Sequence, residues 1–120
     1  MPSVKIPIPP TVEEAQVDRA FAALADPTRR AILRHLRTGQ ANVNDIASRF
    51  AISQPAISRH LRILEDAELI GTERDGQQRL RRLSPQGLLH AQRFIQDMAS
   101  YWPDRLNALA IFLDHTKDPT

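Results

Sequence analysis

The chain has 120 residues, the size of one domain, so a single hydrophobic core must support its function. It contains no cysteine, which excludes disulfide bonds, thiolate metal sites and thiol redox sensing. No segment has the run of roughly 20 apolar residues that a membrane span needs, and the first residues lack the charged-then-apolar order of a signal peptide. We therefore expect a soluble protein of the cytoplasm.

Positive charge is concentrated in the middle of the sequence. The net charge is only +2, but residues 27–83 carry 11 Lys and Arg against 6 Asp and Glu, a net charge of +5. The two flanking segments together carry −3. A basic centre of this kind is the electrostatic footprint that a nucleic-acid-binding protein requires.

The first ten residues hold four prolines and show no helical periodicity, which predicts an extended arm over residues 1–10. An amphipathic helix is predicted next, over residues 12–25. Its apolar residues Val17, Ala20, Phe21 and Leu24 recur at the spacing of one helical face.

Three further helices are predicted between residues 26 and 67. Asp26, Asn42 and Ser53 can each cap a helix N-terminus, and each precedes apolar residues that recur every three or four positions. Pro27 suits a first helical turn, where its missing N–H would be unpaired anyway. The third and fourth helices are separated by a very short join, which indicates a helix-turn-helix. The residues expected to face the core are Ile32, Leu33, Leu36, Ile46, Ala47, Phe50, Ile57, Leu61 and Leu64.

The periodicity changes after residue 67. Residues 69–74 and 77–83 flank Asp75-Gly76, a pair that readily adopts the positive φ angles of a two-residue turn, so a β-hairpin is predicted. Ser84-Pro85 then opens a helical region with a long apolar stripe, which Pro103 either kinks or divides in two. The stripe is longer than one small core can cover, which predicts packing against a second copy of the chain.

The fourth predicted helix has an outer face suited to the major groove of DNA. Its apolar residues fix the buried side and turn polar side chains outward, among which Gln can pair with adenine, Arg with guanine and Ser with several base edges. The alternative is an ordinary solvated helix surface, which the basic centre and the adjacent hairpin disfavour. The outward side chains are Gln54, Pro55, Ser58, Arg59 and Arg62.

Two segments, FAALADPTRRAIL at residues 21–33 and SQPAISRHLRIL at residues 53–64, closely resemble the ArsR family of bacterial regulators. The resemblance covers roughly residues 17–84, and Tyr101-Trp102 with Arg105-Leu106 looks like the last helix of the metal-independent branch. It implies a mainly α winged helix-turn-helix with a small β-hairpin, dimeric through its terminal helices. In such proteins the fourth helix reads the major groove and the hairpin wing touches the DNA backbone or minor groove.

The chain departs from the family pattern at three places. Glu68 stands where the family usually has glycine; a Glu at positive φ would cost on the order of 1 kcal/mol, so we expect the helix end to differ locally. Asn42 and Asn44 stand where metal-sensing relatives have cysteines, so no thiolate sensor can form there. Pro103 falls inside a segment that the resemblance would make helical, which leaves the dimer geometry open.

Two sets of functional residues are predicted. His60 adjoins the buried Leu61, so a packing or hydrogen-bonding role is weighed against a DNA contact, and strand alternation places Arg79 and Arg81 on one face with Arg82 on the other. The DNA-binding set is Gln54, Pro55, Ser58, Arg59, His60, Arg62, Arg74, Arg79 and Arg81. The dimerisation set is Val17, Phe21, Leu24, Leu88, Ile95, Met98, Trp102, Leu106, Leu109 and Leu113.

The predicted organisation is an arm over residues 1–10, a winged helix-turn-helix domain over 11–84 and a dimerisation region over 85–120. We predict a transcriptional repressor that binds a pseudo-palindromic operator as a homodimer, with no catalytic residue, cofactor or metal site and an unassigned effector. Two alternatives stay open. One is a winged-helix protein-interaction module, and the other is a metal-responsive regulator that uses His90, His115 and nearby carboxylates.

Overall fold

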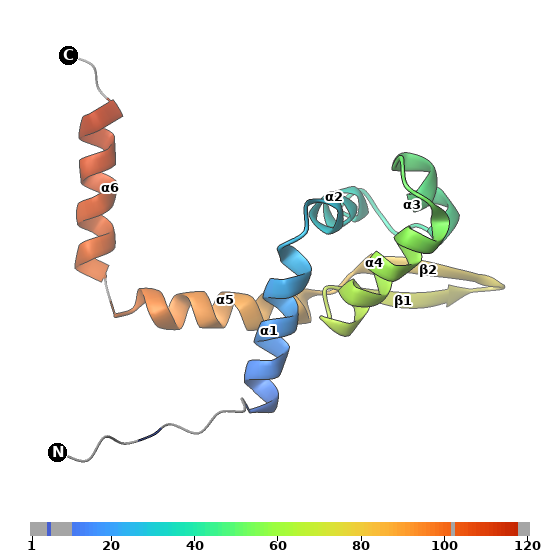
Figure 1. Ribbon diagram of the computed structural model, residues 1–120, viewed down its shortest axis with the longest axis horizontal. Coiled ribbons are helices and arrows are strands. Elements are labelled where there is room, and N and C mark those ends of the chain that lie inside the picture. Colours follow the sequence, from blue (N-terminus) through green and yellow to red (C-terminus); the bar gives the residue numbers. More distant parts are fainter. Residues whose placement is uncertain (1–4, 6–10, 102, 118–120) are drawn as a thin grey trace.

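The computed structural model describes residues 5, 11–101 and 103–117, and of residues 103–106 and 116–117 it describes the backbone only. The arm predicted at residues 1–10 therefore lies, apart from Lys5, outside the described residues. The described chain is mainly helical with one β-hairpin, as predicted (Figure 1). The elements in chain order are α1 (Val12–Leu24), α2 (Pro27–Leu36), α3 (Val43–Arg49), α4 (Gln54–Asp66), β1 (Ile70–Asp75), β2 (Gln78–Leu83), α5 (Pro85–Ala99) and α6 (Pro103–Lys117).

The three predicted helix caps are confirmed. The Asp26 carboxylate accepts a hydrogen bond from the Arg29 N–H at 2.9 Å, and the Asn42 side chain accepts one from the Asp45 N–H at 2.8 Å. The Ser53 hydroxyl does the same for the N–H of residue 56 at 3.3 Å. Each cap satisfies a backbone donor that has no partner inside its helix, which fixes where α2, α3 and α4 begin.

The core lies where α2, α3 and α4 meet. Burying each large apolar side chain there stabilises the fold by about 1.5–3 kcal/mol. Because these side chains come from the three helices and from the segment just after α4, their burial fixes the helix-turn-helix as a unit. The largest fully buried residues are Ile32, Ile46, Ile57, Leu61, Leu64 and Leu69.

The hairpin turn lies one residue later than predicted. Asp75 pairs with Gln78 across the antiparallel ladder, so Gly76 and Gln77 form the two-residue loop. Of the two loop residues, Gly76 has a positive φ, of 65°, as in a turn whose first central residue is glycine. The prediction of Asp75-Gly76 as the turn was wrong because Asp75 still belongs to the ladder. Ala41, before α3, also pairs with Arg81 of β2, which attaches the hairpin to the helical core.

The end of α4 keeps the left-handed conformation that Glu68 was expected to disfavour. Glu68 has φ 58°, its N–H donates to the Glu65 carbonyl at 2.9 Å, and the Leu69 N–H donates to the Leu64 carbonyl at 2.9 Å. These two bonds form a Schellman motif, usually built with glycine. The expected local difference was therefore wrong: the tertiary contacts of this turn hold a non-glycine residue in the same geometry.

Gly87, in the first turn of α5, docks directly on this turn. Its N–H donates to the Glu68 carbonyl at 2.8 Å. A Cβ atom at Gly87 would lie only 2.3 Å from the carbonyl oxygen of Ala67, so no larger residue fits without movement of α4 or α5. The start of α5 is thereby attached to the end of α4.

The terminal region forms two helices, because α5 ends at Ala99 and α6 begins at Pro103. A proline is well placed in a first helical turn but cannot continue a helix, which settles the alternatives left open for Pro103. α5 passes across α1, where Phe21 and Phe94 make an edge-to-face contact with ring centroids 5.8 Å apart. Among the described residues, no helix combines the length and hydrophobicity needed to cross a membrane.

Candidate nucleic-acid interface

α4 presents a polar face away from the core. Ile57, Leu61 and Leu64 are buried, and the spacing of the helix turns the positions between them outward. Five of the predicted DNA-contacting residues are exposed there. They are Gln54, Pro55, Ser58, Arg59 and Arg62.

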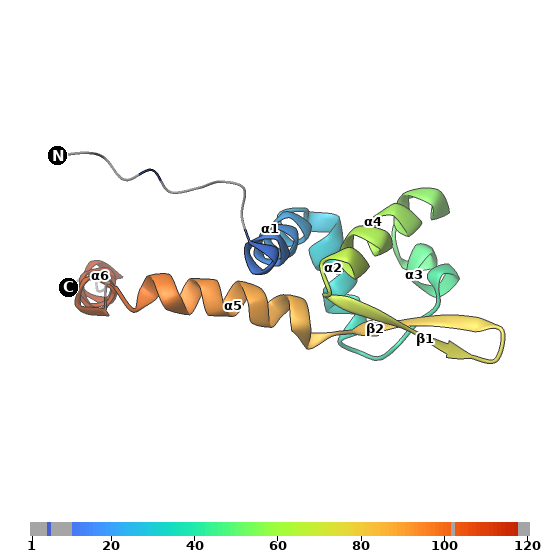
Figure 2. The ribbon, with the colours of Figure 1, turned by 90° about the horizontal axis from the view of Figure 1, so that it is seen from below.

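α4 and the hairpin lie at one end of the molecule, whereas α5 and α6 extend toward the other (Figures 1 and 2). α3 packs against α4 and contacts β2 of the hairpin. A hollow of about 380 Å³ separates the start of α3 from the hairpin and is lined by Asn42, Asn44 and Arg79, among others. The outer face of α4, the start of α3 and the hairpin therefore form a surface that a duplex could contact in one approach.

Several cations on this surface are free to meet phosphate. In the portion of the chain that the structure describes, the side chains of Arg59, Arg62, Arg74 and Arg79 are exposed and form no hydrogen bond or ion pair with the protein. Arg74 and Arg79 are direct partners across the hairpin ladder, near its tip. Two like charges opposite each other destabilise a strand pair, so an external anion that bridges them would relieve a cost present in the free protein.

Arg81 does not share this exposure, although it was predicted with the DNA-binding set. Its side chain is 15% exposed, and its Nη1 donates to the Thr72 hydroxyl at 2.7 Å and to the Glu65 carboxylate at 3.3 Å. The Thr72 hydroxyl also donates to the Glu65 carboxylate. Arg81 therefore ties the hairpin to α4, and its charge is compensated within the protein.

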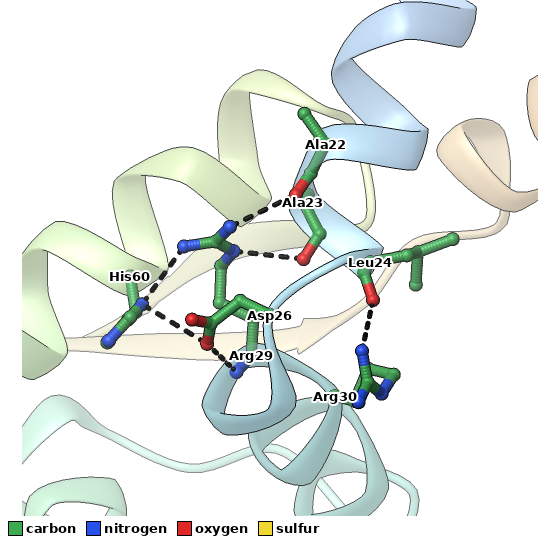
Figure 3. A network of polar contacts seen from close by, with 7 residues as sticks. All are labelled: Ala22, Ala23, Leu24, Asp26, Arg29, Arg30 and His60. Atoms are coloured by element: carbon green, nitrogen blue, oxygen red, sulfur yellow. Dashed lines mark hydrogen bonds and ion pairs between the residues drawn. The ribbon is translucent and has the colours of Figure 1, made fainter.

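His60 likewise points from α4 toward the junction of α1 and α2 (Figure 3). Its Nδ1 lies 3.3 Å from Nη1 of Arg29 and 4.0 Å from the Asp26 carboxylate, and its side chain is 21% exposed. A guanidinium group can only donate, so the shorter contact requires Nδ1 to accept and leaves the ring proton on Nε2. The arrangement favours the hydrogen-bonding role that was weighed for His60 over a DNA contact by its Nδ1 edge.

Arg29 is the centre of this network. Its Nε donates to the Ala23 carbonyl at 2.9 Å and its Nη2 to the Ala22 carbonyl at 3.0 Å, which satisfies carbonyl groups at the end of α1 (Figure 3). The hydrogen bond from the Arg29 N–H, followed by the charge of Arg29, holds the pKa of the Asp26 carboxyl below its ordinary value of 3.8. Arg29 therefore joins α1, α2 and α4.

Sequence reasoning missed the role of Arg29. Asp26 was identified as a helix cap, but nothing in the local pattern shows that an arginine three residues later reaches back to one helix and across to another. The one signal was the motif itself, since Arg29 lies within the segment of residues 21–33 that carries the family resemblance.

The predicted dimerisation residues form a partly exposed stripe along α1 and α5. Leu88 and Ile95 are 51% and 54% exposed, and with Phe21, Leu24 and Ala91 they line a hollow of about 380 Å³. Val17 and Met98 are half-buried, and Leu109 and Leu113 are exposed on α6. Trp102 and the side chain of Leu106 lie outside the described residues.

Comparison with known proteins identifies the family of this chain. The profile of the bacterial regulatory protein, arsR family, matches residues 26–72, which span α2 to the start of the hairpin. The chain is 37% identical over 103 residues to the HTH-type transcriptional regulator Rv2034 of Mycobacterium tuberculosis, covering 86% of this chain and 94% of that protein. It is 49% identical over 61 residues to the transcriptional repressor SdpR of Bacillus subtilis, covering 51% of this chain and 68% of the relative.

Solved structures show the same relationship. An ArsR-like transcriptional regulator from Rhodococcus sp. RHA1 superposes with a TM-score of 0.69 at 28% identity, over 82% of this chain and 93% of that one. A crystal structure of a possible transcriptional regulator for arsenical resistance gives 0.62 at 38% identity, over 78% and 94% of the two chains. A winged helix-turn-helix domain from Mycobacterium bovis, 24% identical over 77% of this chain and 91% of that one with a TM-score of 0.58, shares the fold. The chain belongs to the ArsR family of bacterial regulatory proteins and is a winged helix-turn-helix, DNA-binding transcriptional regulator.

Proposed function

We propose that this regulator is a homodimeric repressor that reads a pseudo-palindromic operator with α4 and grips the DNA backbone with the hairpin. The observation that carries the proposal is the exposed face of α4, whose Arg59 and Arg62 have no partner among the described residues. SdpR of Bacillus subtilis is a repressor by name, which supports the direction of regulation. The proposed role is carried out on DNA, so we propose that the protein acts in the cytoplasm and without catalysis.

In the proposed complex, Gln54, Ser58 and Arg59 contact base edges in the major groove. Arg74 and Arg79 contact phosphate oxygens from the hairpin. Arg81 and His60 act indirectly, because their contacts lie within the protein. Two such surfaces must be about 34–36 Å apart to meet successive major grooves, which is why the proposal requires a dimer.

The experiment begins with selection of bound duplexes from random sequences, which should recover an inverted repeat. Gel shifts on that operator and on a scrambled duplex, over a range of salt, then distinguish recognition of bases from contact with the phosphate backbone. Arg59→Ala should weaken operator binding by about 1–3 kcal/mol and relax preference at one base position in each half-site. Arg79→Ala should weaken both duplexes and lower the slope of log affinity against log salt by about one unit per lost phosphate contact, about two for a dimer.

Arg19→Ala is the matched control, because Arg19 is an exposed arginine on α1, outside this surface. It should leave both affinities and the salt slope near the wild-type values. Equal weakening of both duplexes by Arg59→Ala, with base preference kept, would show that α4 grips the backbone and does not read bases.

The two alternatives are tested separately. A protein-interaction module would need an uncharged or acidic face on α4, which exposed Arg59 and Arg62 disfavour. A metal-responsive regulator would need ligands near His90, which lies 3.4 Å from the Glu68 carboxylate, or near His115. We expect stoichiometric zinc, copper or arsenite to leave operator affinity unchanged, and a tenfold change would favour the metal-responsive alternative.

A further inference from the structure

α2 carries a row of arginines on the side opposite its buried face. Ile32 and Leu36 point into the core beside α4, whereas Arg30, Arg34 and the C-cap residue Arg37 follow the spacing of one helical face on the other side. Arg34 and Arg37 are exposed and, within the described part of the chain, form no side-chain hydrogen bond or ion pair. The row faces away from α4, so the DNA that α4 reads is not placed to neutralise it.

An apolar hollow of about 250 Å³ lies beside the arginine row. It is lined by leucines from four elements, and two of them, Leu24 and Leu88, also line the hollow of the predicted dimerisation stripe. The arginine row is therefore continuous with the surface on which the second copy is proposed to pack. The four leucines are Leu24, Leu33, Leu83 and Leu88.

α1 carries the opposite charge on the same face as its part of that stripe. The spacing of Glu14, Val17, Phe21 and Leu24 places them on one side of the helix, and Asp18, one turn after Glu14, borders that side. Both acidic side chains are exposed, and among the described residues neither side chain has an ion-pair partner. Within one chain, the like charges of each row repel one another. The acidic row of α1 and the arginine row of α2 are opposite in charge.

The two rows are kept apart in a single chain. Glu14 precedes Leu24 by ten residues, which corresponds to about 15 Å along the helix axis. α2 begins near the opposite end of α1 from its first turn (Figure 1). The acidic turns therefore cannot reach the arginine row of their own chain.

We propose that in the homodimer the acidic turns of α1 from one copy dock on the arginine row of α2 in the other. The inference rests on the proposed homodimer. A twofold axis perpendicular to α1 runs the two α1 helices antiparallel, which brings the first turns of each helix beside the α2 helix of the partner copy. A parallel arrangement would set acidic turns against each other, so electrostatics selects the antiparallel dimer. Because the dimer is symmetric, the contact between α1 and the partner's α2 occurs twice.

Reciprocal charge reversal tests the docking directly by sedimentation of the full chain without DNA. Arg34→Glu with Arg37→Glu should raise the dimer dissociation constant by about tenfold or more, and so should Glu14→Lys with Asp18→Lys. The variant that combines all four changes should return to within about threefold of the wild type, because it restores opposite charges. Raised salt should weaken the wild-type dimer.

Two controls protect the result from effects on folding. Arg49→Glu makes the same charge change in the last turn of α3, where Arg49 is exposed, and should leave the dimer intact. Glu14→Gln with Asp18→Asn removes the acidic charge with little change in shape, and should give an intermediate dissociation constant. Circular dichroism of every variant checks that the helices remain.

The outcomes separate this inference from the proposed function. Wild-type dimerisation by the Arg34→Glu, Arg37→Glu variant would overturn the docking while leaving the dimer itself standing. Failure of the combined variant to recover would also overturn it. If the Arg34→Glu, Arg37→Glu variant dimerised normally but bound DNA more weakly, with a smaller dependence of log affinity on log salt, the arginine row would be a DNA contact and the docking would be overturned. A wild-type chain that stays monomeric on DNA would remove the dimer and the docking together.

Discussion

Replacing Gly87 with alanine tests how α5 is attached to the end of α4. The new Cβ would lie 2.3 Å from the Ala67 carbonyl oxygen, 2.9 Å from Cδ2 of Leu69 and 3.0 Å from the carbonyl carbon of Glu68. Two of these three atoms are backbone atoms, which cannot rotate away as the end of a flexible side chain can. The start of α5 must therefore move from the end of α4, which also strains the hydrogen bond from the Gly87 N–H to the Glu68 carbonyl.

The sign of the effect depends on two opposing terms. Alanine has the higher helix propensity, by about 0.8–1.0 kcal/mol in a helix interior and by less in a first turn. Overpacking costs about 1–3 kcal/mol, and weakening a buried backbone hydrogen bond adds about 0.5–1.5 kcal/mol. The packing terms win, and we expect a net loss of about 1–3 kcal/mol in the free energy of unfolding.

The assay is urea unfolding at one protein concentration, because the stability of the proposed dimer depends on concentration. Gly71→Ala is the matched control, since a Cβ there meets nothing closer than 3.8 Å. That change should leave stability unchanged or raise it by about 0.4–1 kcal/mol. A Gly87→Ala protein as stable as the wild type would show that α5 does not depend on close contact with the turn after α4. Gel shifts on the same protein should show weaker operator binding if the junction also positions α4.

Three further changes test single contacts. Glu68→Gly should raise the free energy of unfolding by up to about 1 kcal/mol, measured in urea, because glycine adopts the left-handed conformation without strain. Arg81→Ala should lower it by about 1–2 kcal/mol through lost bonds to α4 and β1, while the salt slope of DNA binding stays unchanged, unlike in Arg79→Ala. The pKa of Asp26 lies below 3.8 in the folded state, so stability falls as the pH drops through 3.8 toward that lower value. Asp26→Asn should lose less stability than the wild type between about pH 6 and about pH 3, as urea midpoints would show.

Much of the fold follows from local chemistry that can be read along the chain. Asp26, Asn42 and Ser53 mark helix starts because a short polar side chain can satisfy free N–H groups wherever it occurs. Apolar periodicity likewise identifies Ile57, Leu61 and Leu64 as the buried side of α4, and hence the opposite side as the exposed one. These inferences depend on residues within one or two turns of each other, so they need no knowledge of the rest of the chain.

Only the tertiary structure decided which polar side chains are free to bind a partner and which backbone conformation Glu68 adopts. Arg79 and Arg81 lie on the same face of β2 by strand alternation. Glu65, 16 residues before Arg81, nevertheless compensates the charge of Arg81 and not that of Arg79. His60 turns inward because Arg29, 31 residues earlier, reaches it from α2. Glu68 keeps a left-handed φ because Gly87 of the next helix docks on its carbonyl. In each case the partner is distant in sequence, and a charge or hydrogen bond depends on distance in space, which local periodicity does not encode.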